Sequence, residues 1–241
     1  TIGAGRRVAT VARRIKRLAD NRTFIVQIMN PGWFDARAID LVAVPHHDRA
    51  KPGENVLHVT GAPHQVRGET LAKAADAWRD RFAHLPRPWI AVLVGGSAKG
   101  RALDGASIAD LAGRLDGFAR RTGGSLLITS SRRTDARAMD ALLARLAAPR
   151  FAHRWEQGGE NPYFGLLALA DAVVVTGDSM SMCSEACASG APVYIFARDE
   201  FITPKYARFH RELYDLGFAR PLSDAASAGR GGQGRLNAAD G

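Results

Sequence analysis

One stretch, positions 170–196, contains the strongest candidates for binding a ligand. An apolar, β-branched run at 172–175 predicts a strand that is buried on both faces. Residues 176–179 then supply turn and helix-capping chemistry, and residues 180–189 have the length of a three-turn helix. A second apolar run at 193–196 predicts the following strand. The stretch is therefore a strand–helix–strand unit whose loop opens a helix.

The loop and the start of its helix suit the phosphates of a nucleotide. A helix N-terminus presents free N–H groups and partial positive charge, which favour phosphate oxygens. Ser179 and Ser181 add hydroxyl groups on either side of Met180. Glu185 follows Ser181 by four residues, so both lie on one helix face, where the carboxylate could accept hydrogen bonds from two sugar hydroxyls. An ordinary capped helix with an exposed glutamate is the alternative, and the spacing leaves both open.

Asp178 fits this nucleotide interpretation less well than its neighbours do. Its charge would repel a diphosphate placed directly beside it. We therefore expect this carboxylate either to cap the helix or to bind a sugar hydroxyl, and it stays among the candidate donor-binding residues.

A glycine-rich loop follows another apolar strand and carries further candidate residues. Gly95, Gly96 and Ser97, with Lys99 just beyond, come after the strand predicted at 90–94. Their spacing matches neither the Walker A pattern nor GxGxxG. A glycine turn at the carboxyl end of a parallel strand is nevertheless a common ligand position, and a plain strand-to-helix turn is the alternative.

Two arginines and an asparagine complete the candidate set. Arg132 and Arg133 follow the strand predicted at 125–129, where guanidinium groups suit phosphate contacts. Exposed arginines at the start of a helix are the alternative. Asn161 lies in the loop before the next predicted helix, where a nucleobase could fit. We interpret the nearby Tyr163 as core packing rather than as a ligand contact.

These candidates need a scaffold that brings the ends of several strands together. Strands and helices alternate from residue 89 onward, which predicts an α/β domain with a doubly wound parallel sheet. The three loops then fall at the carboxyl ends of strands, on one edge of that sheet. We predict a nucleotide-sugar-binding lobe at 89–221, a helical connector at 67–88, and a disordered tail at 222–241 that is rich in Ala, Gly and Ser.

Residues 1–66 predict a smaller, partial α/β lobe. An amphipathic helix at 5–20 carries arginines opposite its apolar side, and strands are expected at 23–28, 39–44 and 56–59. The apolar mass is too small for a complete domain, so we expect an exposed sheet edge and low stability. The helix either packs on the domain or lies on an anionic lipid surface.

A polar segment, Pro45-His46-His47-Asp48, follows one of these strands. Adjacent histidines project in different directions and no further ligand lies at a suitable spacing, so we predict no metal there. A loop acid or base that faces a cleft, and a polar surface turn, both remain open.

Composition and charge narrow the class of protein. The 241 residues are 46% hydrophobic and 24% charged, as in soluble globular proteins, and the formal net charge of +9 favours an anionic partner. No nucleic-acid motif or aromatic interleaving accompanies the arginines, so we expect no nucleic-acid partner. Cys183 and Cys187 fit no zinc or disulfide spacing, which predicts small, buried packing residues.

With these motifs in hand, the chain resembles the mitochondrial fission "elongated mitochondria" family, which contains plant fission factors and bacterial proteins regarded as nucleotide-sugar glycosyltransferases. The similarity runs from about residue 6 to residue 221. The matching segments are VLVGG at 92–96, LITSSRR at 127–133, NPY at 161–163 and TGDSMSMCSEA at 176–186. More distantly, Ser181, Glu185, Gly190 and Pro192 are similar to the donor lobe of two-lobed GT-B glycosyltransferases.

The resemblance implies a GT-B-like α/β fold in which a partial N-terminal lobe accompanies a Rossmann-like donor lobe. It implies transfer from a nucleotide-diphosphate sugar without a metal or cofactor. The acceptor would be unknown, for example a lipid-linked or envelope glycan, and no catalytic base is assigned. One alternative is a non-catalytic adaptor that recruits a dynamin-like GTPase, and a weaker one is a sugar-nucleotide epimerase. We expect a bacterial, cytoplasmic protein, with peripheral attachment to the inner face of the membrane through the basic helix as an option.

Overall fold

The computed structural model describes residues 1–32, 39–96 and 103–223. Contacts between residues divide the chain into two compact units, and the division falls between Ala62 and Pro63. The predicted lobe boundaries at residues 66 and 88 remain predictions. The predicted tail lies almost wholly outside the described residues, as do Ser97 and Lys99. No helix in the described ranges combines the length and apolar character that a membrane span requires.

The second unit is built on a parallel sheet in the order β10-β9-β8-β5-β6-β7. From β5 the chain first adds strands on one side and then returns to add β8, β9 and β10 on the other. The order therefore reverses between β5 and β8, where open α/β sheets bind ligands at their carboxyl edge. The strands are β5 (Trp89–Val94), β6 (Ser125–Ser130), β7 (Arg150–His153), β8 (Ala172–Thr176), β9 (Val193–Phe196) and β10 (Arg220–Pro221).

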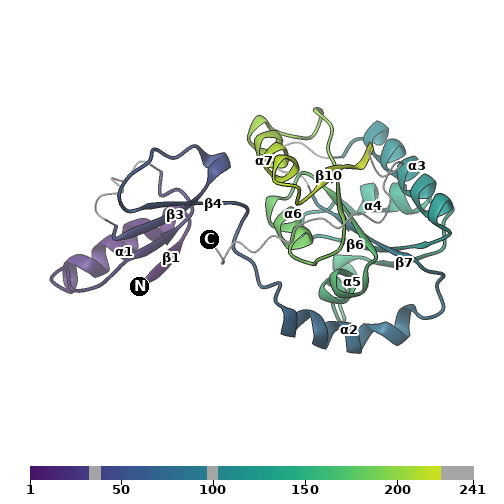
Figure 1. Ribbon diagram of the computed structural model, residues 1–241, viewed down its shortest axis with the longest axis horizontal. Helices are drawn as coiled ribbons and strands as arrows, with labels where there is room; N and C mark the ends of the chain where they lie inside the picture. The colour runs from purple at the N-terminus through teal and green to yellow at the C-terminus, as the bar shows by residue number, and fades with distance from the viewer. Residues whose placement is uncertain (33–38, 97–102, 224–241) are drawn as a thin grey trace. The chain divides into compact units, whose positions relative to one another are not determined.

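Helices cover both faces of this sheet, which confirms the predicted doubly wound α/β architecture (Figure 1). Side chains alternate along β5, so that Leu93 enters one apolar cluster and Val92 enters the other. α2, α5, α6 and α7 contribute to the first cluster, and α3 and α4 to the second. The helices are α2 (Gly68–Phe82), α3 (Gly105–Thr122), α4 (Ala136–Leu143), α5 (Tyr163–Leu169), α6 (Met180–Cys187) and α7 (Pro204–Asp215), with a 3₁₀ turn at Trp155–Gln157.

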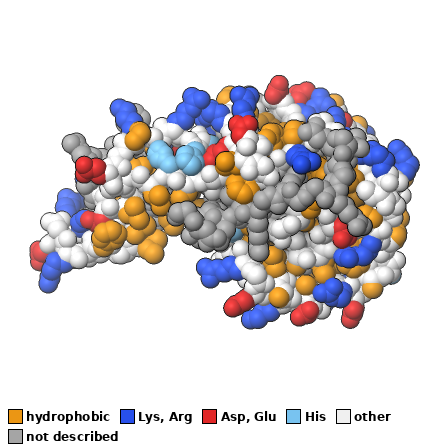
Figure 2. Space-filling model, in the orientation of Figure 1, with side chains coloured by type: hydrophobic (Ala, Val, Ile, Leu, Met, Phe, Trp, Pro, Cys, Tyr) orange, Lys and Arg blue, Asp and Glu red, His pale blue; other side chains and the backbone are white. Residues whose placement is uncertain are grey.

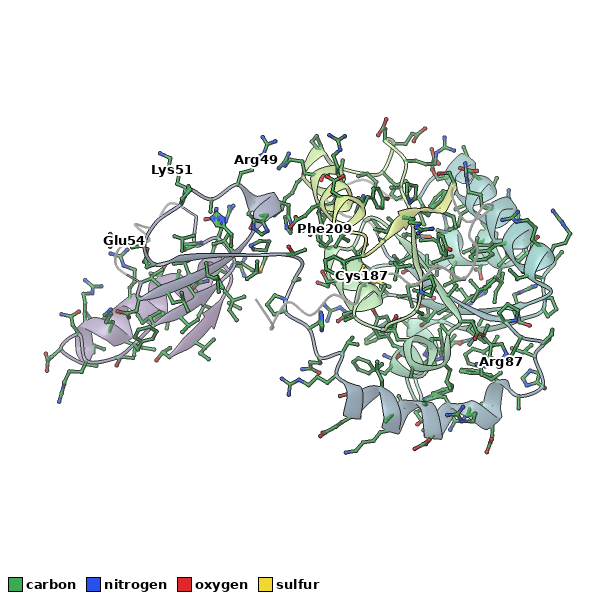
Figure 3. The ribbon with its side chains drawn as sticks, in the orientation of Figure 1. Arg49, Lys51, Glu54, Arg87, Cys187 and Phe209 are labelled. Carbon is green, nitrogen blue, oxygen red and sulfur yellow. The ribbon has the colours of Figure 1, made fainter. Side chains whose placement is uncertain are left out.

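The interior of the second unit contains both cysteines of the sequence. Cys183 and Cys187 on α6 are free and both are buried, as the sequence predicted. Cys187 of α6 and Phe209 of α7 lie in the same apolar cluster (Figure 3). Burial raises the pKa of the Cys187 thiol to about 12, so this side chain acts as a small apolar residue rather than as a nucleophile.

The first unit is a four-stranded parallel sheet in the sequential order β1-β2-β3-β4. Within the residues that the structure describes, its buried apolar cluster holds five side chains, far fewer than either cluster of the second unit: Ala12, Ile25, Ile39, Val42 and Val44. Its elements are β1 (Ile2–Ala4), α1 (Arg6–Leu18), β2 (Val26–Ile28), β3 (Leu41–Pro45), a 3₁₀ turn at His46–Asp48, and β4 (Val56–Val59). The sequence missed β1.

Part of the apolar side of α1 is exposed, unlike that of a helix packed on its domain. Ala9 and Ala12 are buried, whereas Val11 and Leu18 are 57% and 68% exposed. α1 approaches β1 closely, since a Cβ on Gly3 would lie 2.6 Å from Val8 Cγ1. Figure 2 shows hydrophobic side chains gathered on the visible surface of the first unit. The larger apolar residues of α1 therefore form a solvent-facing stripe.

Candidate functional site

The two loops at the reversal point of the sheet are fastened to each other by Thr176, the last residue of β8. Its hydroxyl oxygen accepts the backbone N–H of Gly95 over 2.7 Å, and its O–H donates to Oδ1 of Asp178 over 2.6 Å. The loop after β5 and the loop after β8 therefore form one hydrogen-bonded unit at the carboxyl edge of the sheet. Sequence reasoning gave Thr176 only a turn role, because the bond to Gly95 spans 81 positions.

Asp178 lies beneath the glycine loop and is 2% exposed. A Cβ on Gly95 would lie 2.4 Å from its Oδ1, so only glycine permits this approach. Burial raises the pKa of Asp178 to about 6, although hydrogen bonds from Thr176 and the Gly96 backbone and the charge of Arg133 oppose the rise. The carboxylate therefore holds the loops together. It does not cap α6, which was one of the two roles we expected for it.

The loop after β6 packs directly on the glycine loop. The Thr134 hydroxyl lies 2.5 Å from the Gly95 carbonyl oxygen and 2.9 Å from that of Val94, while the Ser131 N–H donates to Val94 over 3.0 Å. Arg132 and Arg133 are exposed in this loop. They precede α4, which starts at Ala136. Both guanidinium groups are therefore available to an anion at this edge.

α6 begins at the β8 loop with its cap in place. Ser179 is the N-cap, and its Oγ accepts the Met182 N–H over 3.4 Å. Met180 is half-buried and Ser181 is exposed in the first turn. The remaining N–H groups of this turn give the edge a partial positive charge that favours an anion.

Glu185 lies one turn beyond Ser181 on α6 and is half-buried. The Tyr163 hydroxyl at the start of α5 donates to its Oε2 over 2.5 Å. Burial raises the pKa of Glu185 and the hydrogen bond from Tyr163 lowers it. The Asn161 side chain accepts the Tyr163 N–H over 3.0 Å, so Asn161 fixes the start of α5. Interpreting Tyr163 as core packing alone missed this bond, since nothing in the local sequence pairs residues 22 positions apart.

α7 contributes two residues near the β8 loop that the sequence analysis did not single out, His210 and Tyr206. The buried ring of His210 lies with Nε2 2.9 Å from the carbonyl oxygen of Gly177. A Cβ on Gly177 would lie 2.4 Å from that ring, so Gly177 must be glycine. Burial raises the pKa of Tyr206, which also lies within electrostatic reach of Arg133 and Asp178.

A cavity of about 500 Å³ adjoins this network, and His210 forms part of its wall. It lies between the end of β9, α7, β10 and α3. Arg198 in its wall donates to Asp110 over 3.2 Å and to Glu200 over 2.8 Å, so its charge is already balanced. Exposed positive charge therefore comes from the β6 loop and also from Arg211, an exposed residue of the cavity wall.

The structure thus brings most of the predicted residues to one edge, in two groups. Gly95, Gly96, Arg133 and Asp178 are in mutual contact or close electrostatic range, and Glu185 is joined to Asn161 through Tyr163. α6 links the groups, because it starts at Ser179 and carries Glu185. An anion-binding loop followed at one to two turns by a carboxylate can hold a phosphate group and a polyhydroxyl group side by side.

A family model described as mitochondrial fission ELM1 matches residues 1–240 of this chain. The chain belongs to the mitochondrial fission ELM1 family. It is 35% identical over 247 residues to the mitochondrial fission protein ELM1 of Arabidopsis thaliana, a match that covers 92% of this chain and 56% of the plant protein. An uncharacterised Rickettsia prowazekii protein is 26% identical over 255 residues, covering 93% of this chain and 72% of that protein. This ELM1-family chain therefore spans little more than half of its plant relative.

Solved structures define the fold of this ELM1-family chain. MurG of Acinetobacter baumannii has a TM-score of 0.50 at 18% identity, covering 92% of this chain and 60% of MurG. UDP-GlcNAc 2-epimerase of Neisseria meningitidis, bound to UDP-GlcNAc, has a TM-score of 0.53 at 12% identity, covering 94% and 66%. Apo UGT2 of Phytolacca americana has a TM-score of 0.52 at 10% identity, covering 91% and 62%. At these identities the similarity shows the fold alone, and it confirms the predicted GT-B-like α/β class.

Proposed function

We propose that this chain binds a nucleotide-diphosphate sugar and transfers the sugar to an acceptor. The observation that carries the proposal is the convergence of three loops at the reversal point of the sheet, with Glu185 one turn below them. Any one of these loops is common, but exposed arginines, a glycine turn and a capped helix at one edge suit a diphosphate. The GT-B-like fold agrees with this assignment.

Each part of the edge has a role in the proposal. The glycine-loop backbone, the first turn of α6 and the guanidinium groups of Arg132 and Arg133 hold the diphosphate. Glu185 accepts hydrogen bonds from the ribose, and Asn161 lies toward the base. Positive charge then stabilises the leaving diphosphate, so we expect transfer to need neither a metal nor another cofactor. The acceptor and the catalytic base are left unassigned.

A thermal-shift panel of UDP, GDP, ADP, TDP and CMP tests the proposal on the purified chain. We expect one nucleotide to stabilise the protein selectively, since a 100-fold excess over Kd adds roughly 2.7 kcal/mol to the free energy of unfolding. Glu185→Ala should lose most of that stabilisation. Glu69→Ala, which removes an exposed carboxylate from α2, is the matched control and should keep it. A folded protein that no nucleotide stabilises would refute the proposal.

A second candidate function is a non-catalytic adaptor that recruits a dynamin-like GTPase. The solvent-facing apolar stripe on α1 favours it, because such a surface suits a protein partner. Replacing Val11 and Leu18 by aspartate should then abolish binding of a purified dynamin-like GTPase. An adaptor should bind that GTPase and no sugar nucleotide, which separates the two functions.

The same helix supports an anionic membrane surface as a partner. α1 carries arginines along its length next to the exposed apolar residues, a pattern typical of interfacial helices. In this version the protein is cytoplasmic and attaches to the inner face of a bacterial membrane. Co-sedimentation with vesicles containing phosphatidylglycerol, but not with phosphatidylcholine vesicles, is the expected result, and equal binding to both would exclude it.

Sugar-nucleotide epimerisation is a weaker alternative that the Neisseria meningitidis structure keeps open, since that enzyme shares the fold. Incubation with UDP-GlcNAc and analysis by NMR distinguishes it. A new epimer without any acceptor would favour epimerisation over transfer.

A further inference from the structure

The pair formed by Tyr163 and Glu185 is the least expected contact of the candidate site. The phenolic O–H of Tyr163 donates to Oε2 of Glu185 over 2.5 Å, a short and charge-assisted hydrogen bond. In the described part of the chain, Tyr163 is the hydrogen-bond partner of this carboxylate. Oε1, and the second lone pair of Oε2, are therefore left to accept hydrogen bonds from a ligand.

Tyr163 is held in place independently of Glu185. Its backbone N–H donates to the Asn161 side chain over 3.0 Å. Its ring packs edge-to-face on Phe164, with 5.7 Å between ring centroids, and contacts the apolar cluster beneath α5. A phenol fixed in this way determines the rotamer of a carboxylate that lies on a different helix.

We propose that Tyr163 is a positioning residue that orients Glu185 so that its free oxygen recognises a ribose 2′-hydroxyl, which makes the site selective for ribonucleotides over 2′-deoxyribonucleotides. This inference rests on the proposed function and adds a specificity that the function does not require. A carboxylate held by one partner cannot turn to satisfy itself elsewhere, so a ligand that lacks the 2′-hydroxyl leaves a half-buried acceptor unpaired.

The affinity for a ribonucleotide should depend on the protonation of Glu185. The ionised carboxylate is a much stronger acceptor than the protonated acid, so ribonucleotide affinity should fall as the pH falls through the pKa of Glu185. The hydrogen bond from Tyr163 lowers that pKa against the effect of burial. Removal of the phenol should therefore move the loss of affinity to higher pH.

The test compares Kd values, measured by calorimetry, for the nucleotide that stabilises the wild type most and for its 2′-deoxy form. We expect the wild type to prefer the ribonucleotide by about tenfold or more. Tyr163→Phe, which keeps the ring, should reduce this ratio to about threefold or less while changing the affinity for the deoxynucleotide by less than about twofold. Tyr214→Phe removes a phenol from α7 and should keep the wild-type ratio.

The outcomes separate this inference from the proposed function. A wild type that binds no nucleotide refutes both. A wild type that binds and discriminates, with the same ratio and the same pH profile in Tyr163→Phe, leaves the proposed function standing and overturns the positioning role. Titrations at 10 °C, below any lowered Tm, keep the comparison valid if loss of the bond between α5 and α6 reduces stability.

Discussion

The backbones of Gly96 and Arg133 approach each other so closely that a Cβ on Gly96 would lie 2.1 Å from the Arg133 carbonyl oxygen. Backbone cannot rotate away as a flexible side chain can, so alanine at this position must displace the whole β6 loop. We predict that Gly96→Ala lowers the free energy of unfolding by about 1–3 kcal/mol. Urea denaturation would measure the loss, and nucleotide affinity should fall with it because Arg133 moves.

Gly113 provides the control for this prediction. It lies in the middle of α3, is exposed, and a Cβ there would meet no atom within 4 Å. Gly113→Ala should stabilise the protein by about 0.5–1 kcal/mol, because alanine loses less backbone entropy in a helix. Equal effects of the two substitutions would show that the Gly96 contact is not a tight one.

The buried carboxylate of Asp178 should make stability depend on pH in an identifiable window. Its pKa of about 6, against the ordinary 3.8, means that the folded state holds the proton more tightly than the unfolded state. The contribution to stability is therefore complete below about pH 4 and is lost as the pH rises through about 6. Complete loss corresponds to about 3 kcal/mol.

Asp178→Asn isolates this effect, because the amide cannot ionise and its oxygen can still accept the Thr176 hydroxyl. Urea unfolding of both proteins from pH 4.5 to pH 8 should give curves that diverge in favour of the variant as the pH rises. Parallel curves over the whole range would show that Asp178 does not change its protonation state there.

Much of the scaffold could be predicted because short stretches of sequence determine its strands and helix starts. The apolar run before Gly95 and the run before Thr176 each predicted a strand, and Ser179 predicted a helix start. The rule that ligands bind where parallel strands end then placed the glycine, arginine and serine loops at one edge.

The contacts that complete the edge could not be predicted, because they join residues that are distant in the sequence. Tyr163 reaches Glu185 across 22 positions, and His210 reaches Gly177 across 33. Each residue alone is compatible with simple packing. The apolar stripe of α1 was predictable only in part. Helical spacing identified the apolar side of the helix correctly, but periodicity does not say whether another element covers that side.

The small core of the first unit predicts early local unfolding. Among the described residues its apolar cluster holds five buried side chains, whereas strands of the second unit, such as β5, are buried on both faces. Hydrogen exchange should therefore be faster for the amides of β3 than for those of β5, by roughly 100-fold or more under native conditions. The comparison uses one sample and needs no variant, and equal protection in the two strands would contradict it.

The exposed guanidinium group of Arg133 should act on the phosphates of a nucleotide and not on its base or ribose. Arg133→Ala is expected to weaken binding of the nucleoside diphosphate by roughly tenfold or more, the effect of losing one charge-assisted hydrogen bond, and to leave binding of the nucleoside unchanged. Arg121→Ala removes the same charge from the exposed end of α3, so it controls for net charge and should leave both affinities unchanged. The difference in nucleoside diphosphate affinity between the wild type and Arg133→Ala should shrink as salt rises from 50 to 500 mM, because exposed charges are screened.

Equal weakening by Arg133→Ala and Arg121→Ala would contradict a direct phosphate contact. It would mean that Arg133 contributes only to the general electrostatic field of a protein with a net charge of +9.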